Sequence, residues 1–169
     1  HEKGYYDVSG CGANIAWHTE NDQLEIADRD VLLTDIKIYL LSALRVANAE
    51  VLPFDWIATC DEFLGTIDGY EAASQGLADL GPARAATLAL KAALARLPDA
   101  SVEARNAVVQ ELSRILVPIN YTREPRFRHD PAYTVPPLPT LAVAGEMAEF
   151  AEGHMRKMAQ TELLRGQNR

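Results

Sequence analysis

The sequence between residues 28 and 53 reads DRDVLLTDIKIYLLSALRVANAEVLP. Its apolar residues recur at steps of three and four, which is the spacing of one face of an α-helix. They form two stripes, one of Leu32, Ile36, Tyr39, Ala43 and Ala47 and the other of Leu33, Leu40 and Leu44. A helix that is apolar on two sides is normally buried inside a bundle. We expect this helix to begin at Asp28 or Asp30 as N-cap and to end before Pro53, which bars its continuation.

The same periodicity predicts three more helices in the middle of the chain. They run from about Asp55 to Ser74, from Pro82 to Leu97, and from Asp99 or Ser101 to a point before Pro118. Pro82 suits the first turn of a helix, and Asp and Ser are good N-caps. These signals indicate an all-α chain of four to five helices packed as a bundle.

A proline-rich connection separates the last expected helix from the others. Residues 118–139 hold six of the nine prolines, and we expect no helix there because proline removes backbone hydrogen bonds. The last helix is expected to begin near Leu141, and the tail at residues 166–169 is expected to fray. The proposed core stripe of this last helix consists of Ala144, Met147, Ala148, Phe150, Ala151, Met155 and Met158. His154, on the same helix, is expected to be an exposed helix residue.

Composition limits the classes of function. The 169 residues carry 16 Lys and Arg against 24 Asp and Glu, and the net charge of −8 argues against a general binder of nucleic acid or anionic membranes. No apolar run reaches the ~18 residues that a transmembrane helix needs. Two cysteines are too few for a disulfide framework. The chain opens at His1 rather than Met, and we expect it to be an excised or processed piece of a longer protein.

The first 20 residues are rich in glycine, show no helical period and are expected to form a loop. They contain no phosphate-binding Gly-Lys-Ser/Thr motif, and no second His follows His1 at zinc-motif spacing. His18 lies just before the first expected helix, in the run WHTENDQLE at residues 17–25. A neutral imidazole suits zinc, and a loop position would let it reach a metal held mainly by residues from elsewhere. On spacing alone, a solvated loop histidine is the better interpretation.

Three stretches together resemble a known family. Residues 17–22, WHTEND, resemble the Tyr/Trp-His-Thr-x-x-Asp-Thr signature of two-zinc aminopeptidases and glutamate carboxypeptidases. Residues 44–55, LRVANAEVLPFD, are similar to the Leu-Ala-Asn-x-x-Val-Leu-Pro-Phe-Asp segment of the glutamate carboxypeptidase II-like exopeptidases, and residues 125–129, PRFRH, are similar to their Pro-Phe-Tyr-Arg-His run. All three occur in family order. The chain therefore resembles the C-terminal part of such an exopeptidase, including its transferrin receptor-like dimerisation domain.

The resemblance implies a domain organisation and a set of site residues. Residues 1–27 would be the end of the catalytic domain, and residues 28–169 would be the helical dimerisation domain. His18 matches the last ligand of the two-zinc site, whereas the other ligands and the general-base Glu lie upstream, so no catalytic residue is expected within this chain. Trp17, Arg126, Arg128 and His129 are the candidates for the substrate cleft. Structural ion pairs of the Arg and His side chains with Glu124 and Asp130 are an open alternative.

The implied function is metal-assisted hydrolysis of terminal peptide bonds by the parent enzyme, a zinc metallopeptidase that forms a homodimer. Trp17 stands where glutamate carboxypeptidases have a Tyr, and residues 133–139 lack their Lys, which favours a general aminopeptidase or dipeptidase. The isolated chain is expected to be inactive and to bind no zinc tightly, because one ligand cannot hold a catalytic zinc. Family members suggest a secreted, periplasmic or cell-surface location. The alternative is a free-standing, non-catalytic helical interaction module.

Overall fold

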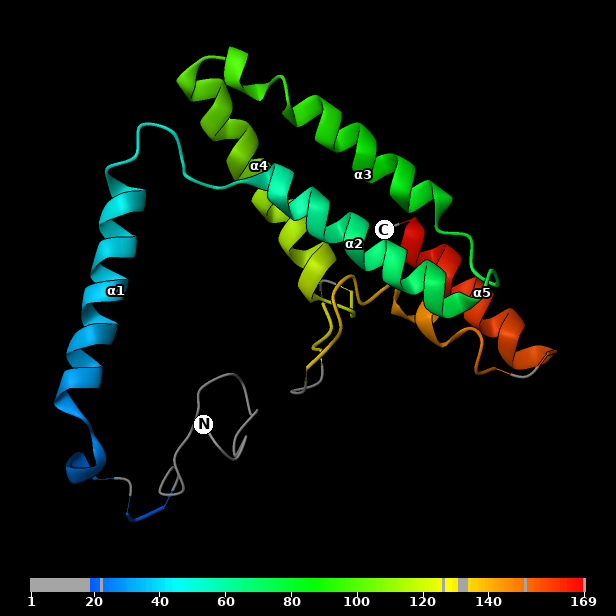
Figure 1. Ribbon diagram of the computed structural model, residues 1–169, viewed down its shortest axis with the longest axis horizontal. Coiled ribbons are helices and arrows are strands. Elements are labelled where there is room, and N and C mark those ends of the chain that lie inside the picture. Colours follow the sequence, from blue (N-terminus) through cyan, green and yellow to red (C-terminus); the bar gives the residue numbers. More distant parts are fainter. Residues whose placement is uncertain (1–18, 22, 126, 131–133, 151, 169) are drawn as a thin grey trace. The chain divides into compact units, whose positions relative to one another are not determined.

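The computed structural model describes residues 19–21, 23–125, 127–130, 134–150 and 152–168, and all regular secondary structure in these ranges is helical (Figure 1). The five α-helices are α1 (Arg29–Ala47), α2 (Trp56–Ser74), α3 (Gly81–Leu94), α4 (Val102–Tyr121) and α5 (His154–Gln167). Three 3₁₀ turns accompany them, namely η1 (Leu24–Ile26), η2 (Leu97–Asp99) and η3 (Ala142–Glu146). The predicted all-α class is confirmed. Within these ranges no helix has the length and apolar character needed to span a bilayer.

The chain divides into two compact units. One comprises residues 1–53 and 131–134, and its described part contains η1 and α1; the other comprises residues 54–130 and 135–169 and contains α2 to α5. The second unit is the helical bundle. The domain boundary that the resemblance places after residue 27 stays a prediction.

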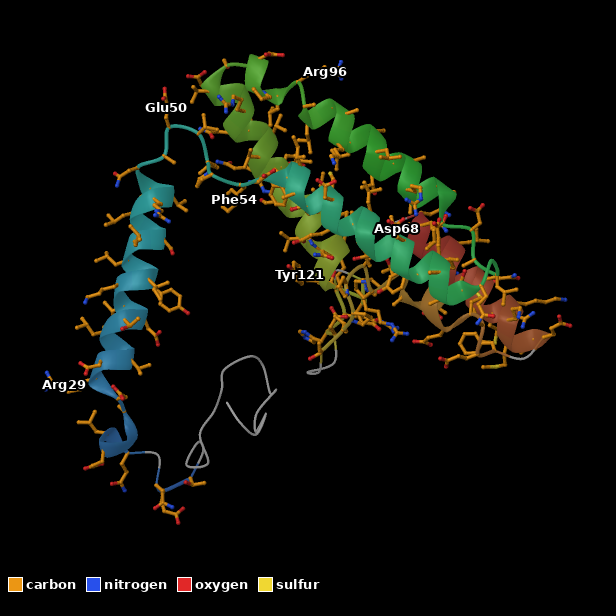
Figure 2. All side chains as sticks on the ribbon, viewed as in Figure 1. Arg29, Glu50, Phe54, Asp68, Arg96 and Tyr121 are labelled. Atoms are coloured by element: carbon orange, nitrogen blue, oxygen red, sulfur yellow. The ribbon has the colours of Figure 1, made fainter. Side chains whose placement is uncertain are left out.

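Helix α1 begins as the sequence predicts. The Asp28 carboxylate caps it by accepting hydrogen bonds from the backbone N–H groups of Asp30 and Val31, at 2.9 and 3.1 Å. No residue of α1 is buried, and its ten large apolar side chains are 40–76 % exposed. Side chains project from the helix on every side along its length from Arg29 (Figure 2). Taken by itself, one helix cannot cover its own apolar stripes, so the predicted burial of α1 inside a bundle stays a prediction.

The bundle helices also begin at their predicted signals. Asp55 accepts hydrogen bonds from the N–H groups at the start of α2, Pro82 lies in the first turn of α3, and Ser101 accepts from the N–H of Ala104 in α4. Helix α3 is joined to α2 by charged pairs. Arg84 bonds to Asp68, which Figure 2 labels on α2, at 2.5 Å and to a second carboxylate, that of Glu71, at 2.6 Å.

The core of the bundle lies where α2, α4, α5 and the segment around η3 meet. Helix α2 contacts both α3 and η3, and α5 also contacts η3. The buried cluster consists of Phe63, Ile67, Leu80, Leu116, Leu138, Leu141, Ala144, Met147, Ala159 and Leu163. Three of these residues come from the stretch between 138 and 144, so the end of the proline-rich connection is part of the core.

The predicted end of the fourth helix is wrong, because α4 continues through Pro118 to Tyr121. Proline inside a helix normally costs about 3 kcal/mol, since it lacks the N–H and crowds the preceding turn. Here hydrogen bonds that involve Thr122 and Leu138 stabilise the extra turn. The N–H and hydroxyl of Thr122 donate to the carbonyl of Pro118 at 3.0 and 2.6 Å. The buried Asn120 carboxamide oxygen accepts from the N–H of Leu138 at 3.3 Å.

The predicted last helix is also wrong in its first half. Residues 142–146 form the 3₁₀ turn η3, and α5 begins only after Gly153, whose φ of 111° is unfavourable for other residues. Met147 is buried as expected, but Met155 and Met158 are exposed. The side chains that α5 buries are Ala159 and Leu163.

The C-terminal tail does not fray over its described residues. Helix α5 extends to Gln167, whose side-chain amide donates to the carbonyl of Asp79 at 2.5 Å. Gly166 lies directly against the backbone of Thr140. The tail therefore packs on two distant segments of the bundle.

Candidate functional site

The loop after α4 carries the described candidates for substrate binding. The Asp130 carboxylate accepts hydrogen bonds from the backbone N–H groups of Arg123 and Glu124, both at 2.9 Å. Within this closed loop, the N–H of Arg128 donates to the carbonyl of Pro125 at 2.8 Å. A short acidic side chain thus ties the two ends of the loop together, as Asp commonly does in turns.

A solvent-open hollow of about 610 Å³ lies between this loop and the C-terminal part of α4. Its lining residues are Arg114, Pro118, Thr122, Glu124, Pro125, Arg128 and Asp130. The volume falls within the ~300–1,000 Å³ typical of ligand sites, although the lining here is far more charged than is usual. The lining holds two arginines and two carboxylates, so its formal charges balance. Arg114 is paired with Glu111, which leaves Arg128 as the arginine of the hollow without an ion pair among the described residues.

The sequence-predicted site residues have different outcomes. Trp17, His18 and Arg126 lie outside the described residues, so their predicted roles stay predictions. Arg128 and His129 are both exposed, but only Arg128 lines the hollow.

Ion pairing was the alternative interpretation for the arginines and His129. Among the described residues, no ion pair joins Arg128 or His129 to a carboxylate. The Asp130 carboxylate that was expected as their partner binds backbone N–H groups instead. For Arg128 the geometry therefore favours a group that faces the hollow.

Two features of the site were missed by sequence reasoning. Arg114 lines the hollow together with Pro118, one helical turn further on, and pairs with Glu111 at 3.1 Å. This position could be recognised only if the helix was known to continue through Pro118. Phe127, which is 93 % exposed, is an aromatic side chain on the same loop that does not line the hollow. The sequence signal for Phe127 was its position between two arginines, Arg126 and Arg128.

The hollow can recognise an anion by its chemistry. Guanidinium groups form paired, charge-assisted hydrogen bonds with carboxylates. Within the described ranges, no group of three or more His, Cys, Asp or Glu side chains is placed to hold a metal ion. The described arrangement therefore offers a carboxylate-bearing ligand one guanidinium, that of Arg128, beside the carboxylates of Glu124 and Asp130.

Cys60, the described cysteine, is not suited to nucleophilic chemistry. Its side chain is fully buried in α2. Burial raises the pKa of the Cys60 thiol, and the nearby Asp61 raises it further, while Lys91 opposes them. The thiol therefore stays protonated and unreactive at neutral pH.

Comparison of the chain with protein-family models, with curated proteins and with solved structures found no match. The functional interpretation therefore depends on the sequence and the geometry described above.

Proposed function

We propose that this chain is the C-terminal helical region of a two-zinc exopeptidase and that it supplies one zinc ligand, His18, to the catalytic centre. The observation that carries the proposal is the run WHTEND at residues 17–22, which resembles the zinc-ligand signature of that family. The stretches at 44–55 and 125–129 resemble the same family and follow in the same order. The all-helical class of the described residues is compatible with this proposal at the level of fold class.

The second resembling stretch has a structural role in the chain. Residues 44–55 cover the end of α1, the connection through Pro53 and the N-cap of α2. Asp55 closes this stretch by accepting hydrogen bonds from the N–H groups of Ile57 and Ala58, both at 3.0 Å. The rings of Phe54 and Trp56 lie 6.2 Å apart, within the range of a favourable aromatic pair. This stretch therefore has a folding role in the chain, and its support for the proposal is the sequence resemblance alone.

In the proposed enzyme, two zinc ions would activate a water molecule and polarise the scissile carbonyl. His18 would hold one of them through a neutral imidazole nitrogen. Arg128, in the charged hollow, would bind a carboxylate of the peptide substrate, and Arg126 and His129 are further cleft candidates by resemblance. The remaining zinc ligands and the general base would come from the upstream catalytic domain, so the isolated chain would be inactive.

The first test is to read the gene upstream of the codon for His1. We expect an open reading frame of a few hundred codons that encodes a His-x-Asp and a Glu-Glu motif. A start codon immediately before the codon for His1, or an upstream frame without these motifs, would contradict the proposal.

The second test measures hydrolysis of amino acid and dipeptide p-nitroanilides by the protein that this frame encodes. His18→Ala should lower kcat/KM by about 100-fold or more, because loss of a direct zinc ligand should reduce activity more than loss of a residue that only orients a ligand. The matched control is His154→Ala, which removes an exposed histidine at the start of α5. Wild-type activity in His18→Ala, or an equal loss in both variants, would refute the assigned role of His18.

A zinc titration tests the same assignment on the 169-residue chain itself. One histidine cannot supply the three or four ligands of a tight zinc site, so we expect no stoichiometric binding by calorimetry. Sub-micromolar binding that disappears in His18→Ala would show a complete site within this chain and would overturn the fragment proposal.

A free-standing interaction module is the second candidate function, and α1 favours it. By itself this helix carries ten exposed large apolar side chains, which is more than an isolated surface helix normally shows.

Homodimerisation is expected by resemblance for the longer protein. Light scattering of the longer protein should give a dimer, and a monomer at micromolar concentration would count against that expectation.

A further inference from the structure

A second, chemically different pocket lies between the helices of the bundle and is open to solvent on one side. It has a volume of about 250 Å³ and is formed by α2, α3, α4, the segment at 138–141 and the last turn of α5. Its walls are mainly large apolar side chains, among them Phe63, Ile67, Leu90, Leu116 and Leu141. All of these elements belong to one compact unit, so the pocket is defined within that unit alone.

Of the three polar side chains in the lining, those of Thr87 and Gln167 are already engaged within the protein, and the third is that of Thr140. The hydroxyl of Thr87 donates to the carbonyl of Ala83 at 2.9 Å, and the amide of Gln167 donates to the carbonyl of Asp79 at 2.5 Å. None of the described residues that line the pocket carries a charge. A charged group in contact with this apolar lining would find no charged partner there, which is unfavourable. The lining therefore selects neutral, apolar molecules.

The volume sets the size of the ligand. An apolar protein cavity of about 150 Å³ is large enough to bind benzene. A pocket of about 250 Å³ therefore accommodates a compact bicyclic aromatic. The Thr87 oxygen has lone pairs left after its own donation, so it can accept a hydrogen bond from one hydroxyl of such a ligand.

We propose that the bundle pocket is a binding site for a small, neutral, aromatic molecule of about ten carbon atoms. The proposal goes beyond the exopeptidase function and does not depend on it, because it uses no residue of the zinc or peptide sites. Ala86, an exposed residue of α3 that lines the pocket, gives a way to obstruct it without disturbing the core.

Calorimetric titration of the full chain with 2-naphthol tests the proposal, with naphthalene-2-sulfonate as the charged probe of the same ring. We expect saturable binding of 2-naphthol with one site per chain and at least about tenfold weaker binding of the sulfonate. Absence of saturable 2-naphthol binding up to its solubility limit would overturn the proposal. Equal affinities for the two probes would overturn it as well.

Two substitutions of α3 alanines by leucine locate the binding site. Ala86→Leu should weaken 2-naphthol binding by about tenfold, because the larger side chain displaces about two carbon atoms' worth of ligand contact. Ala85→Leu is the control, since Ala85 is exposed on the same helix and does not line the pocket. Both variants should fold, because leucine is a strong helix former and both positions face solvent. Unchanged binding in Ala86→Leu, or an equal loss in both variants, would refute the assigned pocket.

Discussion

Replacing Gly166 by alanine should destabilise the bundle, although this change stabilises an ordinary helix. A Cβ atom at position 166 would lie 2.0 Å from the carbonyl oxygen of Thr140 and 2.8 Å from its carbonyl carbon. Real Cβ atoms essentially never approach other heavy atoms closer than 3.0 Å. Because the obstacle is backbone, it cannot rotate away as a flexible side chain would. Either the segment around Thr140 or the last turn of α5 has to move.

Two opposing effects set the size of the change. Alanine favours a helix interior over glycine by about 0.8–1 kcal/mol. Overpacking a close contact costs about 1–3 kcal/mol, and moving the last turn of α5 also endangers the hydrogen bond from Gln167 to Asp79, worth about 1 kcal/mol. The steric effect wins, and the free energy of unfolding should fall by about 1–2 kcal/mol.

Urea unfolding followed by far-UV circular dichroism measures this free energy. The matched controls are Gly65→Ala and Gly69→Ala, two exposed positions of α2 where an added Cβ meets nothing within 4 Å. Each control should raise the free energy of unfolding by about 0.5–1 kcal/mol. If Gly166→Ala stabilises the protein as the controls do, the close approach of α5 to Thr140 does not exist and the reasoning is refuted.

Three further predictions use the same unfolding measurement. Ile67→Ala removes a side chain that is 1 % exposed and should lower the free energy of unfolding by about 2–5 kcal/mol, whereas Leu88→Ala, at 49 % exposure, should have a much smaller effect; similar losses would place Ile67 outside the core. Asp55→Ala should lower the free energy of unfolding by about 1 kcal/mol because the N-cap of α2 is lost, and Asp55→Asn should retain most of the stability. Wild-type stability in Asp55→Ala would contradict the capping role. Tyr70→Phe should cost about 1 kcal/mol by removing a hydrogen bond to the proline-rich segment. Burial, and then Glu146, raise the pKa of the Tyr70 hydroxyl, so its contribution is complete below the pKa of the unfolded chain and is lost as the pH rises through the folded pKa. A pH series above 9 should therefore show a steeper loss of stability in wild type than in Tyr70→Phe, and parallel curves would contradict this.

The charged hollow was only partly predictable. Arg128 could be singled out because it lies in a short, basic, proline-bounded loop that resembles a known run. Arg114 could not, because the hollow beside it forms only where α4 continues through Pro118 toward Thr122, another lining residue. That turn depends on the bond between Asn120 and Leu138, which are 18 residues apart, and no pattern within a helix reveals such a bond.

The sequence by itself determined the all-α class and the points where α1 to α4 begin. Asp28, Asp55 and Ser101 each bind N–H groups two or three residues further along the chain, so this information is local. Only the tertiary structure decided that α4 passes through Pro118 and that the last helix breaks before α5. Both outcomes depend on burial and hydrogen bonds between distant segments, whose free energy exceeds the local preferences of proline, alanine and methionine.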